Sequence, residues 1–216
     1  MKILIAGDSW AMGEWPVKQD DGIQHKGLEQ YLLDDGHDVV NISEAGDTLT
    51  AILHCLKLQQ TKYDYVFVFL VEPFAEMQNE FFWDKKLKYE DYYTRHKTKL
   101  TSFVKSIDTL NLGPIKLIGG SAKCLPEYIT DTSIEIAIPS VIELLMPGLR
   151  QYEMNFQYHY HLLDTSNVDQ ITIDKILEQA EKWDRIYKNP IMHPDGEHPN
   201  REGHYKIYQV LKSLYL

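Results

Sequence analysis

Short apolar runs recur along the first half of the chain and predict β-strands. Residues 2–6 form an apolar run that stops at Gly7, and a run this short, ended by a turn residue, is typical of a buried parallel strand rather than a helix. Residues 39–42, 65–71 and 115–118 form further runs of this kind. We therefore expect these four segments to be strands of one sheet.

The segments between these runs carry apolar residues at helical spacing. Such residues recur at i, i+3, i+4 and i+7, which places them on one face of a helix. The three stripes are Leu28, Tyr31 and Leu32; Leu49, Ile52, Leu53 and Leu56; and Leu100, Phe103, Val104 and Ile107. Strands that alternate with helices predict an α/β fold, a three-layer α/β/α sandwich with a parallel central sheet and helices on both faces.

The second half of the chain carries one further apolar run and two more helical stripes. Residues 134–138 form a candidate fifth strand, and Pro139 and Pro147 confine any helix between them. Two more helical stripes follow, one at Ile173, Ile176, Leu177 and Ala180 and one at His204, Ile207, Tyr208, Leu211 and Leu214. Because no repeat, low-complexity tract or linker interrupts the chain, we interpret residues 1–216 as a single domain, with an aromatic-rich insertion around residues 74–98.

The composition excludes several classes of protein. With 216 residues, 44% hydrophobic and 25% charged, the chain is an ordinary globular domain rather than a disordered chain or a disulfide scaffold. The formal net charge of -10 repels phosphate backbones, so we expect no nucleic-acid partner. No segment has the pattern of an export signal or a membrane span, and Cys55 and Cys124 lack metal or redox spacing, so we expect a cytoplasmic protein with no membrane partner.

Ser9 is the first candidate for chemistry. It lies in the turn at residues 7–10, directly after the first strand, and ligands bind at the carboxyl edge of an open parallel sheet. A serine hydroxyl is a weak nucleophile that needs a base within hydrogen-bonding reach, itself oriented by a third group. Asp-Ser turns are also common as simple strand-ending turns, so Ser9 alone does not decide the function.

A second block, near the other end of the chain, supplies the groups that Ser9 would need. Asp195 precedes His198 by three residues in a turn-rich loop. Asp195 can therefore accept a hydrogen bond from one ring nitrogen of His198 and leave the other nitrogen to take the proton of Ser9. We interpret Ser9, His198 and Asp195 as a candidate catalytic triad.

These two blocks resemble those of the SGNH, or GDSL-like, hydrolase family. The family's first block reads Gly-Asp-Ser-Leu or a variant and its last reads Asp-x-x-His-Pro, which residues 7–10 and 195–199 match. The resemblance implies a flavodoxin-like three-layer sandwich and a serine esterase. It also places the family's second block at residues 41–46, where the N–H of Gly46 would join that of Ser9 in the oxyanion hole. Gly46 is equally explained as a turn glycine before a helix, and the two roles are compatible.

The third block departs from the family pattern. After the strand that ends at residue 71 the family shows Gly-x-Asn-Asp, whose asparagine donates to the oxyanion, whereas this chain has Glu72 and Pro73. An ionised Glu72 cannot donate a hydrogen bond, and the loss of one oxyanion donor costs on the order of 100- to 1,000-fold in turnover. We expect Glu72 to lie in the site or at its rim. The enzymatic activity would then be reduced, supported by another donor such as Asn79, or restricted to a specific substrate.

Aromatic residues indicate where a substrate would lie. We predict Trp10, and Trp15 after it, as walls of the substrate pocket, and the aromatic-rich segment could shape the same site. Aromatic platforms suit sugar rings or acyl chains, but a helical insertion packed on the sheet explains the same segment. The histidines lack any recognised zinc spacing, so we expect no metal and no cofactor.

The leading hypothesis is hydrolysis of a small-molecule or carbohydrate ester, with deacetylation of a sugar preferred because of the aromatic segment. The alternative is a binding or structural protein that keeps the hydrolase scaffold with little or no catalysis, because the third-block donor is missing. A flavodoxin-like nucleotide-binding protein is disfavoured, since no glycine-rich phosphate loop follows the first strand.

Overall fold

Five parallel strands form a single sheet in the computed structural model, which describes residues 1–14, 23–70, 89–120, 123–146, 174, 191 and 198–216. The sheet order β2-β1-β3-β4-β5 is the one found in flavodoxin-like doubly wound folds. The strands are β1 (Lys2–Ala6), β2 (Asp38–Asn41), β3 (Tyr65–Phe69), β4 (Ile115–Ile118) and β5 (Glu135–Ile138), and every neighbouring pair is parallel.

The central strands are apolar throughout because both of their faces are covered. Ile3 and Ile5 of β1 belong to one core, whereas Leu4 and Ala6 belong to the other. Consecutive side chains of a strand point to opposite faces, so a strand without polar positions must lie between two helical layers.

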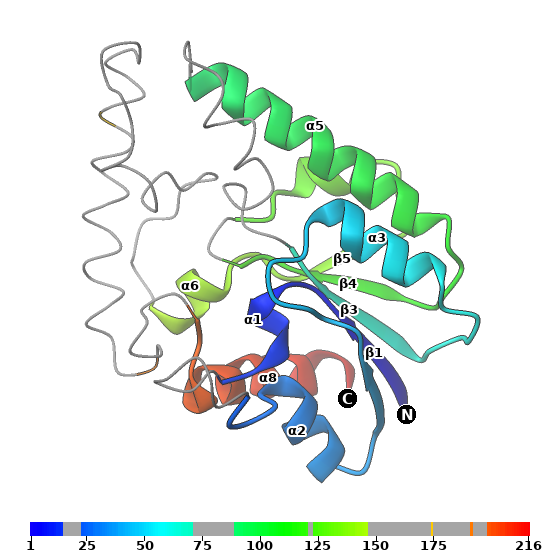
Figure 1. Ribbon diagram of the computed structural model, residues 1–216, viewed down its shortest axis with the longest axis vertical. Coiled ribbons are helices and arrows are strands. Elements are labelled where there is room, and N and C mark those ends of the chain that lie inside the picture. The colour runs from blue at the N-terminus through cyan, green and yellow to red at the C-terminus, as the bar shows by residue number, and fades with distance from the viewer. Residues whose placement is uncertain (15–22, 71–88, 121–122, 147–173, 175–190, 192–197) are drawn as a thin grey trace.

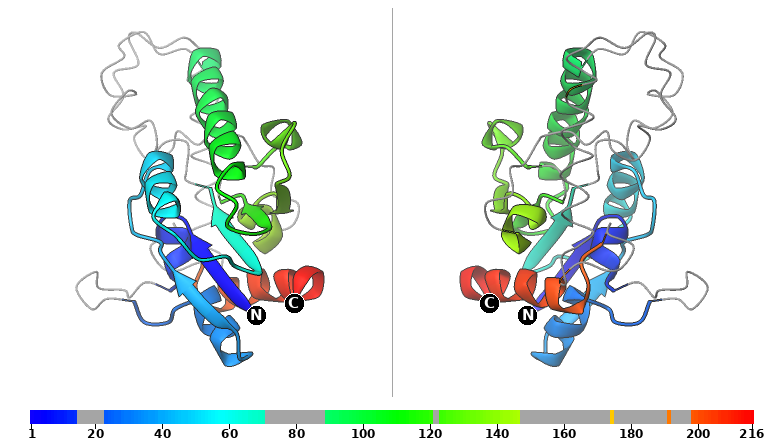
Figure 2. Two further views of the ribbon diagram at one scale, coloured as in Figure 1. Left: turned by 90° about the vertical axis from the view of Figure 1, so that its right-hand side faces the viewer. Right: turned by 90° about the vertical axis from the view of Figure 1, so that its left-hand side faces the viewer.

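The two helical layers lie on opposite faces of this sheet (Figure 1). One layer holds α2 (Leu28–Asp34), α6 (Val141–Leu145) and α8 (Arg201–Tyr215), and the other holds α3 (Leu49–Lys57), α5 (Tyr89–Asp108) and the short 3-10 helix η2 (Pro126–Ile129). Both views of Figure 2 show α5 and α8 on opposite sides of the strands. The predicted three-layer sandwich with a parallel central sheet is therefore confirmed.

The last helix corrects one sequence prediction. The apolar stripe predicts that Leu214 lies on the buried face of α8, but the side chain of Leu214 is 55% exposed. Tyr215 packs against the core instead, with its ring 5.5 Å from that of Tyr65. The reason is the helical period: steps of 3.6 residues from His204 reach position 215 rather than 214 after three turns.

Other sequence predictions agree with the structure or lie beyond its described residues. Gly36, just after α2, has the left-handed conformation that glycine commonly adopts after a helix, with φ of 81°. The candidate fifth strand is β5, and α6 lies between Pro139 and Pro147. The apolar stripe at 173–180 and residues 74–88 of the aromatic-rich insertion predicted around 74–98 fall outside the described residues, and from Tyr89 the chain is in α5. Among the described residues, no helix combines the length and the apolar character needed to cross a bilayer.

Two histidines are buried in the helical layers, and burial lowers the pKa of each. His96 of α5 and His204 of α8 are 1% and 0% exposed. Burial, with the charge of Lys99 as a second cause, lowers the pKa of His96 to about 3. Burial also lowers the pKa of His204 to about 4. In the unfolded chain both imidazoles would take up a proton near pH 6.5.

We predict that the free energy of unfolding falls as the pH drops from 6.5 towards 4. In this window the unfolded chain binds a proton at each histidine and the folded chain does not, so each contributes up to about 1.4 kcal/mol per pH unit. Urea unfolding of His96→Leu at several pH values should show a shallower dependence than the wild type. His54→Gln, a change at an exposed histidine of α3, is the control and should keep the wild-type slope. Equal slopes for His96→Leu and the wild type would contradict the assignment.

Candidate active site

Ser9 lies at the carboxyl edge of the sheet, where β1 ends. The strand order reverses at β1, because β2 pairs with one of its edges and β3 with the other. The crevice outside such a switch point is the usual ligand site of open α/β sheets. Gly7 permits a close turn there, since a Cβ at this position would lie 2.7 Å from the Cβ of Phe69. The turn keeps the chain next to the end of β3 and leaves Ser9 half-buried.

The local sequence begins a short helix, α1 (Ser9–Met12), at the serine itself. Asp8 is the N-cap, and its carboxylate accepts a hydrogen bond from the N–H of Trp10 at 3.0 Å. Its carbonyl accepts from the N–H of Ala11, also at 3.0 Å. Aspartate is among the preferred N-cap residues because its short side chain reaches these N–H groups. Ser9 is consequently the first residue of the helix, where backbone N–H groups point out of the helix end.

His198 reaches this serine from the loop before α8. Asn200 caps α8 by accepting from the N–H of Gly203 at 3.1 Å, and its own N–H donates to the carbonyl of Ile191 at 3.1 Å. Two residues earlier, Nε2 of His198 and Oγ of Ser9 are hydrogen-bonded at 2.8 Å. The two residues are 189 positions apart in the sequence, so the tertiary structure alone brings them together.

Trp10 lies beside this pair but within the core. Its side chain is 4% exposed, and its ring centroid is 6.5 Å from that of His198 with the planes tilted by 51°. The indole also lies near Gly120, where a Cβ would sit 3.9 Å from the ring. This placement supports the histidine from the side of the core, and the predicted contact of Trp10 with a substrate stays a prediction.

The loop after β2 carries Gly46 and is tied to the serine helix by Asn41. Gly46 is exposed, with φ of 78°, and a Cβ at this position would meet no heavy atom within 4 Å. Asn41 ends β2; its Nδ2 donates to the carbonyl of Ala11 at 3.2 Å, and its Oδ1 accepts from the N–H of Ser43 at 3.1 Å. The sequence motifs point to Gly46 and give no role to Asn41, although an asparagine at a strand end is a signal for an Asx turn of this kind.

Several predicted site residues lie outside the described part of the chain. They are Asp195, Glu72, Asn79 and Trp15. The roles of Asp195 as third triad member and of Glu72 as a substrate contact therefore remain predictions. So do those of Asn79 as a replacement oxyanion donor and of Trp15 as a pocket wall. In the ranges that the structure describes, no three His, Cys, Asp or Glu side chains come close enough to hold a metal ion together.

His204 packs behind the site as a neutral ring. It lies in the first turns of α8, and a Cβ on Gly27 would lie 2.7 Å from its Cγ and Nδ1. The backbone of Gly13, which ends α1, also approaches the ring and raises its pKa, but without the geometry of a well-formed hydrogen bond. Burial is the larger effect and lowers the pKa to about 4. The ring thus joins the end of α1 to the start of α8 by packing.

Three known structures align with nearly the whole chain at low sequence identity. A putative GDSL-like lipase from Parabacteroides merdae aligns over 98% of this chain and 94% of its own, with a TM-score of 0.50 and 10% identity. The esterase EstA from Pseudoalteromonas sp. aligns over 98% and 94%, with a TM-score of 0.48 and 20% identity. The acetylxylan esterase Axe2 from Geobacillus stearothermophilus aligns over 98% and 92%, with a TM-score of 0.46 and 16% identity.

Sequence comparison adds nothing to this likeness, since no family model and no curated protein matches the chain. At these identities the structural likeness concerns the fold and not the reaction. The resemblance carried by the two sequence blocks is thereby confirmed at the level of the fold: the chain has the fold of the SGNH, or GDSL-like, hydrolases.

Proposed function

We propose that the protein is a serine esterase that hydrolyses a small-molecule or carbohydrate ester. The observation that carries the proposal is the 2.8 Å hydrogen bond between Oγ of Ser9 and Nε2 of His198 at the carboxyl edge of the sheet. A nucleophile and a base within hydrogen-bonding reach are the recognisable pair of covalent acyl transfer. Their position at the switch point of the strand order gives a substrate the usual place to bind.

In the proposed reaction, Oγ of Ser9 attacks the ester carbonyl while Nε2 of His198 takes the hydroxyl proton. The tetrahedral intermediate then collapses, and His198 returns the proton to the departing alcohol, leaving an acyl group on Ser9. Water deprotonated by His198 attacks the acyl group, and the acid leaves with Ser9 restored. We assign Asp195 to orient the imidazole, on the basis of its spacing of three residues from the histidine.

Two backbone N–H groups are the proposed oxyanion donors. That of Ser9 lies at the amino end of α1, and that of Gly46 lies in the loop after β2. Asn41 links these two segments, since it bonds both the carbonyl of Ala11 and the N–H of Ser43. Such a link matters because oxyanion donors act only when they are held in place before the charge develops.

Among esters, we propose an acetylated sugar as the substrate class. Aromatic residues are abundant in this chain, with 12% Phe, Trp and Tyr, and aromatic rings present flat apolar faces that suit the C–H face of a sugar. An acetyl group is small and needs no long apolar groove. The alternative, a binding protein on the same scaffold, rests on Glu72 standing where the family carries a donor.

We predict that Ser9→Ala removes both esterase activity and covalent labelling by a fluorophosphonate probe while the far-UV circular dichroism stays unchanged. The reason is that the probe reacts only with a serine activated by a nearby base, here His198. Activity is measured on p-nitrophenyl acetate, and the labelled peptide is identified by mass spectrometry.

The matched control is Ser102→Ala, which removes an exposed hydroxyl from α5 and should label like the wild type. Equal turnover by Ser9→Ala and the wild type would refute the nucleophile. A folded wild type that neither labels nor hydrolyses esters would favour the binding protein instead.

We predict that Asn41→Ala lowers kcat about tenfold and leaves KM nearly unchanged, because a displaced oxyanion donor weakens only the transition state. The lost hydrogen bonds should also cost about 1 kcal/mol of stability. Gln30→Ala, which removes a side-chain bond to Asp34 on the surface of α2, is the control and should not alter kcat. A stability loss in Asn41→Ala without any change in kcat would show that Asn41 has a structural role only.

A further inference from the structure

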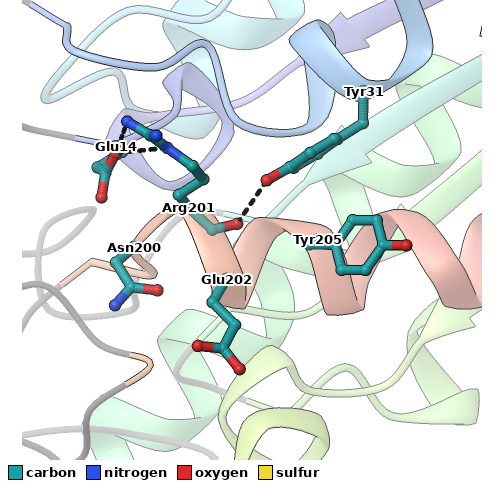
Figure 3. A pocket seen from close by; sticks show the side chains of 6 residues that line it. All are labelled: Glu14, Tyr31, Asn200, Arg201, Glu202 and Tyr205. Carbon is teal, nitrogen blue, oxygen red and sulfur yellow. Dashed lines mark hydrogen bonds and ion pairs between the residues drawn. The ribbon is translucent and has the colours of Figure 1, made fainter. Parts of the chain in front are cut away.

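An open pocket lies where the start of α8 meets α2 and the segment after α1 (Figure 3). It has a volume of about 580 Å³, within the usual range for small-molecule sites. The residues that line it are Glu14, Tyr31, Asn200, Arg201, Glu202 and Tyr205.

Two residues that line the pocket are close in sequence to the proposed catalytic pair. Arg201 follows His198 by three residues, and Glu14 follows Ser9 by five. Three residues span at most about 10 Å, so the Cα atom of Arg201 lies within that distance of the Cα atom of His198. Arg201 therefore lies near the histidine that is hydrogen-bonded to Ser9.

The walls of the pocket are tied together by their own hydrogen bonds. Nε and Nη2 of Arg201 donate to Oε2 of Glu14 at 3.2 and 3.1 Å. The hydroxyl of Tyr31 donates to the carbonyl of Arg201 at 3.1 Å, as the dashed lines of Figure 3 show. These bonds hold the segment after α1, helix α2 and helix α8 in fixed relative positions. Less conformational entropy is therefore lost when a ligand binds.

The two tyrosines of the pocket, Tyr31 and Tyr205, present one exposed ring surface and do not surround a ligand on several sides. The rings of Tyr31 and Tyr205 are 5.1 Å apart and tilted by 58°, so they pack against each other. Two rings packed in this way cannot stack on both sides of a planar nucleobase, and they cannot enclose a cation between parallel faces. Tyr205 is 42% exposed, which leaves ring surface for a ligand.

The charged residues favour a neutral ligand rich in hydroxyl groups. The lining holds two carboxylates, those of Glu14 and Glu202, and one guanidinium, that of Arg201, so an anion such as a phosphate is disfavoured. Carboxylates accept hydrogen bonds from hydroxyl groups, and the guanidinium and the amide of Asn200 donate to them. A flat apolar face surrounded by such groups is suited to a sugar ring.

We propose that this pocket binds the sugar portion of an acylated carbohydrate whose ester group lies at Ser9, with Tyr205 as the stacking residue. The proposal rests on the proposed esterase function and assigns the part of the site that recognises the alcohol side of the ester.

The test compares two substrates, acetylated xylobiose and p-nitrophenyl acetate, which carry the same acyl group on different alcohols. In Tyr205→Ala the ratio of kcat/KM for the sugar ester to kcat/KM for the aryl ester should fall about tenfold, as expected for the loss of one stacking contact. Tyr205→Phe, which keeps the ring, should retain most of the wild-type ratio. Leu214→Ala, a large exposed side chain of the same helix, is the matched control and should leave both activities unchanged.

The outcomes separate this proposal from the esterase function. An unchanged ratio in Tyr205→Ala, or a wild type active on the aryl ester alone, would overturn the sugar site and leave the esterase intact. If the wild type hydrolyses neither ester, titration with xylobiose followed by NMR still tests the pocket. Shifts at residues 201–205 that Tyr205→Ala abolishes would support it, and their absence in the wild type would overturn it.

Discussion

The hydrogen bond between Ser9 and His198 depends on one constraint, the parallel sheet that collects the carboxyl ends of its strands at a single edge. Ser9 is placed there by β1, and His198 is placed there because α8 packs Ile207 and Leu211 into the core on one face of the same sheet. The segments that carry Ser9 and His198 are far apart in the sequence, so no local structure fixes their distance. The 2.8 Å contact is therefore a consequence of the core, and any change that shifts α8 on the sheet would separate the two side chains.

Around this contact, the site is held by short-range features rather than by strong charges. Asp8 caps the serine helix, Asn41 ties the loop after β2 to that helix, and His204 fills the space against Gly27. Each hydrogen bond contributes about 1 kcal/mol, which is small against the contribution of the core. The bridge between Arg201 and Glu14 is partly exposed and contributes about 1 kcal/mol or less, so its role is geometric.

The same arrangement joins the proposed chemistry to the proposed recognition. α8 begins just after the loop that carries His198, and its first turns supply Arg201 and Tyr205 to the pocket. Helix α8 and the loop just before it thus carry both the proposed base and two residues of the proposed sugar pocket. With Glu72 in place of the family's third-block donor, the two proposed backbone donors at Ser9 and Gly46 would carry a larger share of the oxyanion stabilisation.

The strands, most helix positions and the two motif residues Ser9 and His198 could be predicted from the amino-acid sequence, because periodicity and short motifs are local properties of the chain. The sequence pattern wrongly placed Leu214 on the buried face of α8, because the helical period of 3.6 residues brings position 215 to that face instead. Three features come from the tertiary structure: the strand order, the 2.8 Å distance between Ser9 and His198, whose pairing the motifs predicted, and the pairing of Glu14 with Arg201 across 187 residues. These contacts arise from packing between distant segments, and no local pattern encodes the distance between two such segments.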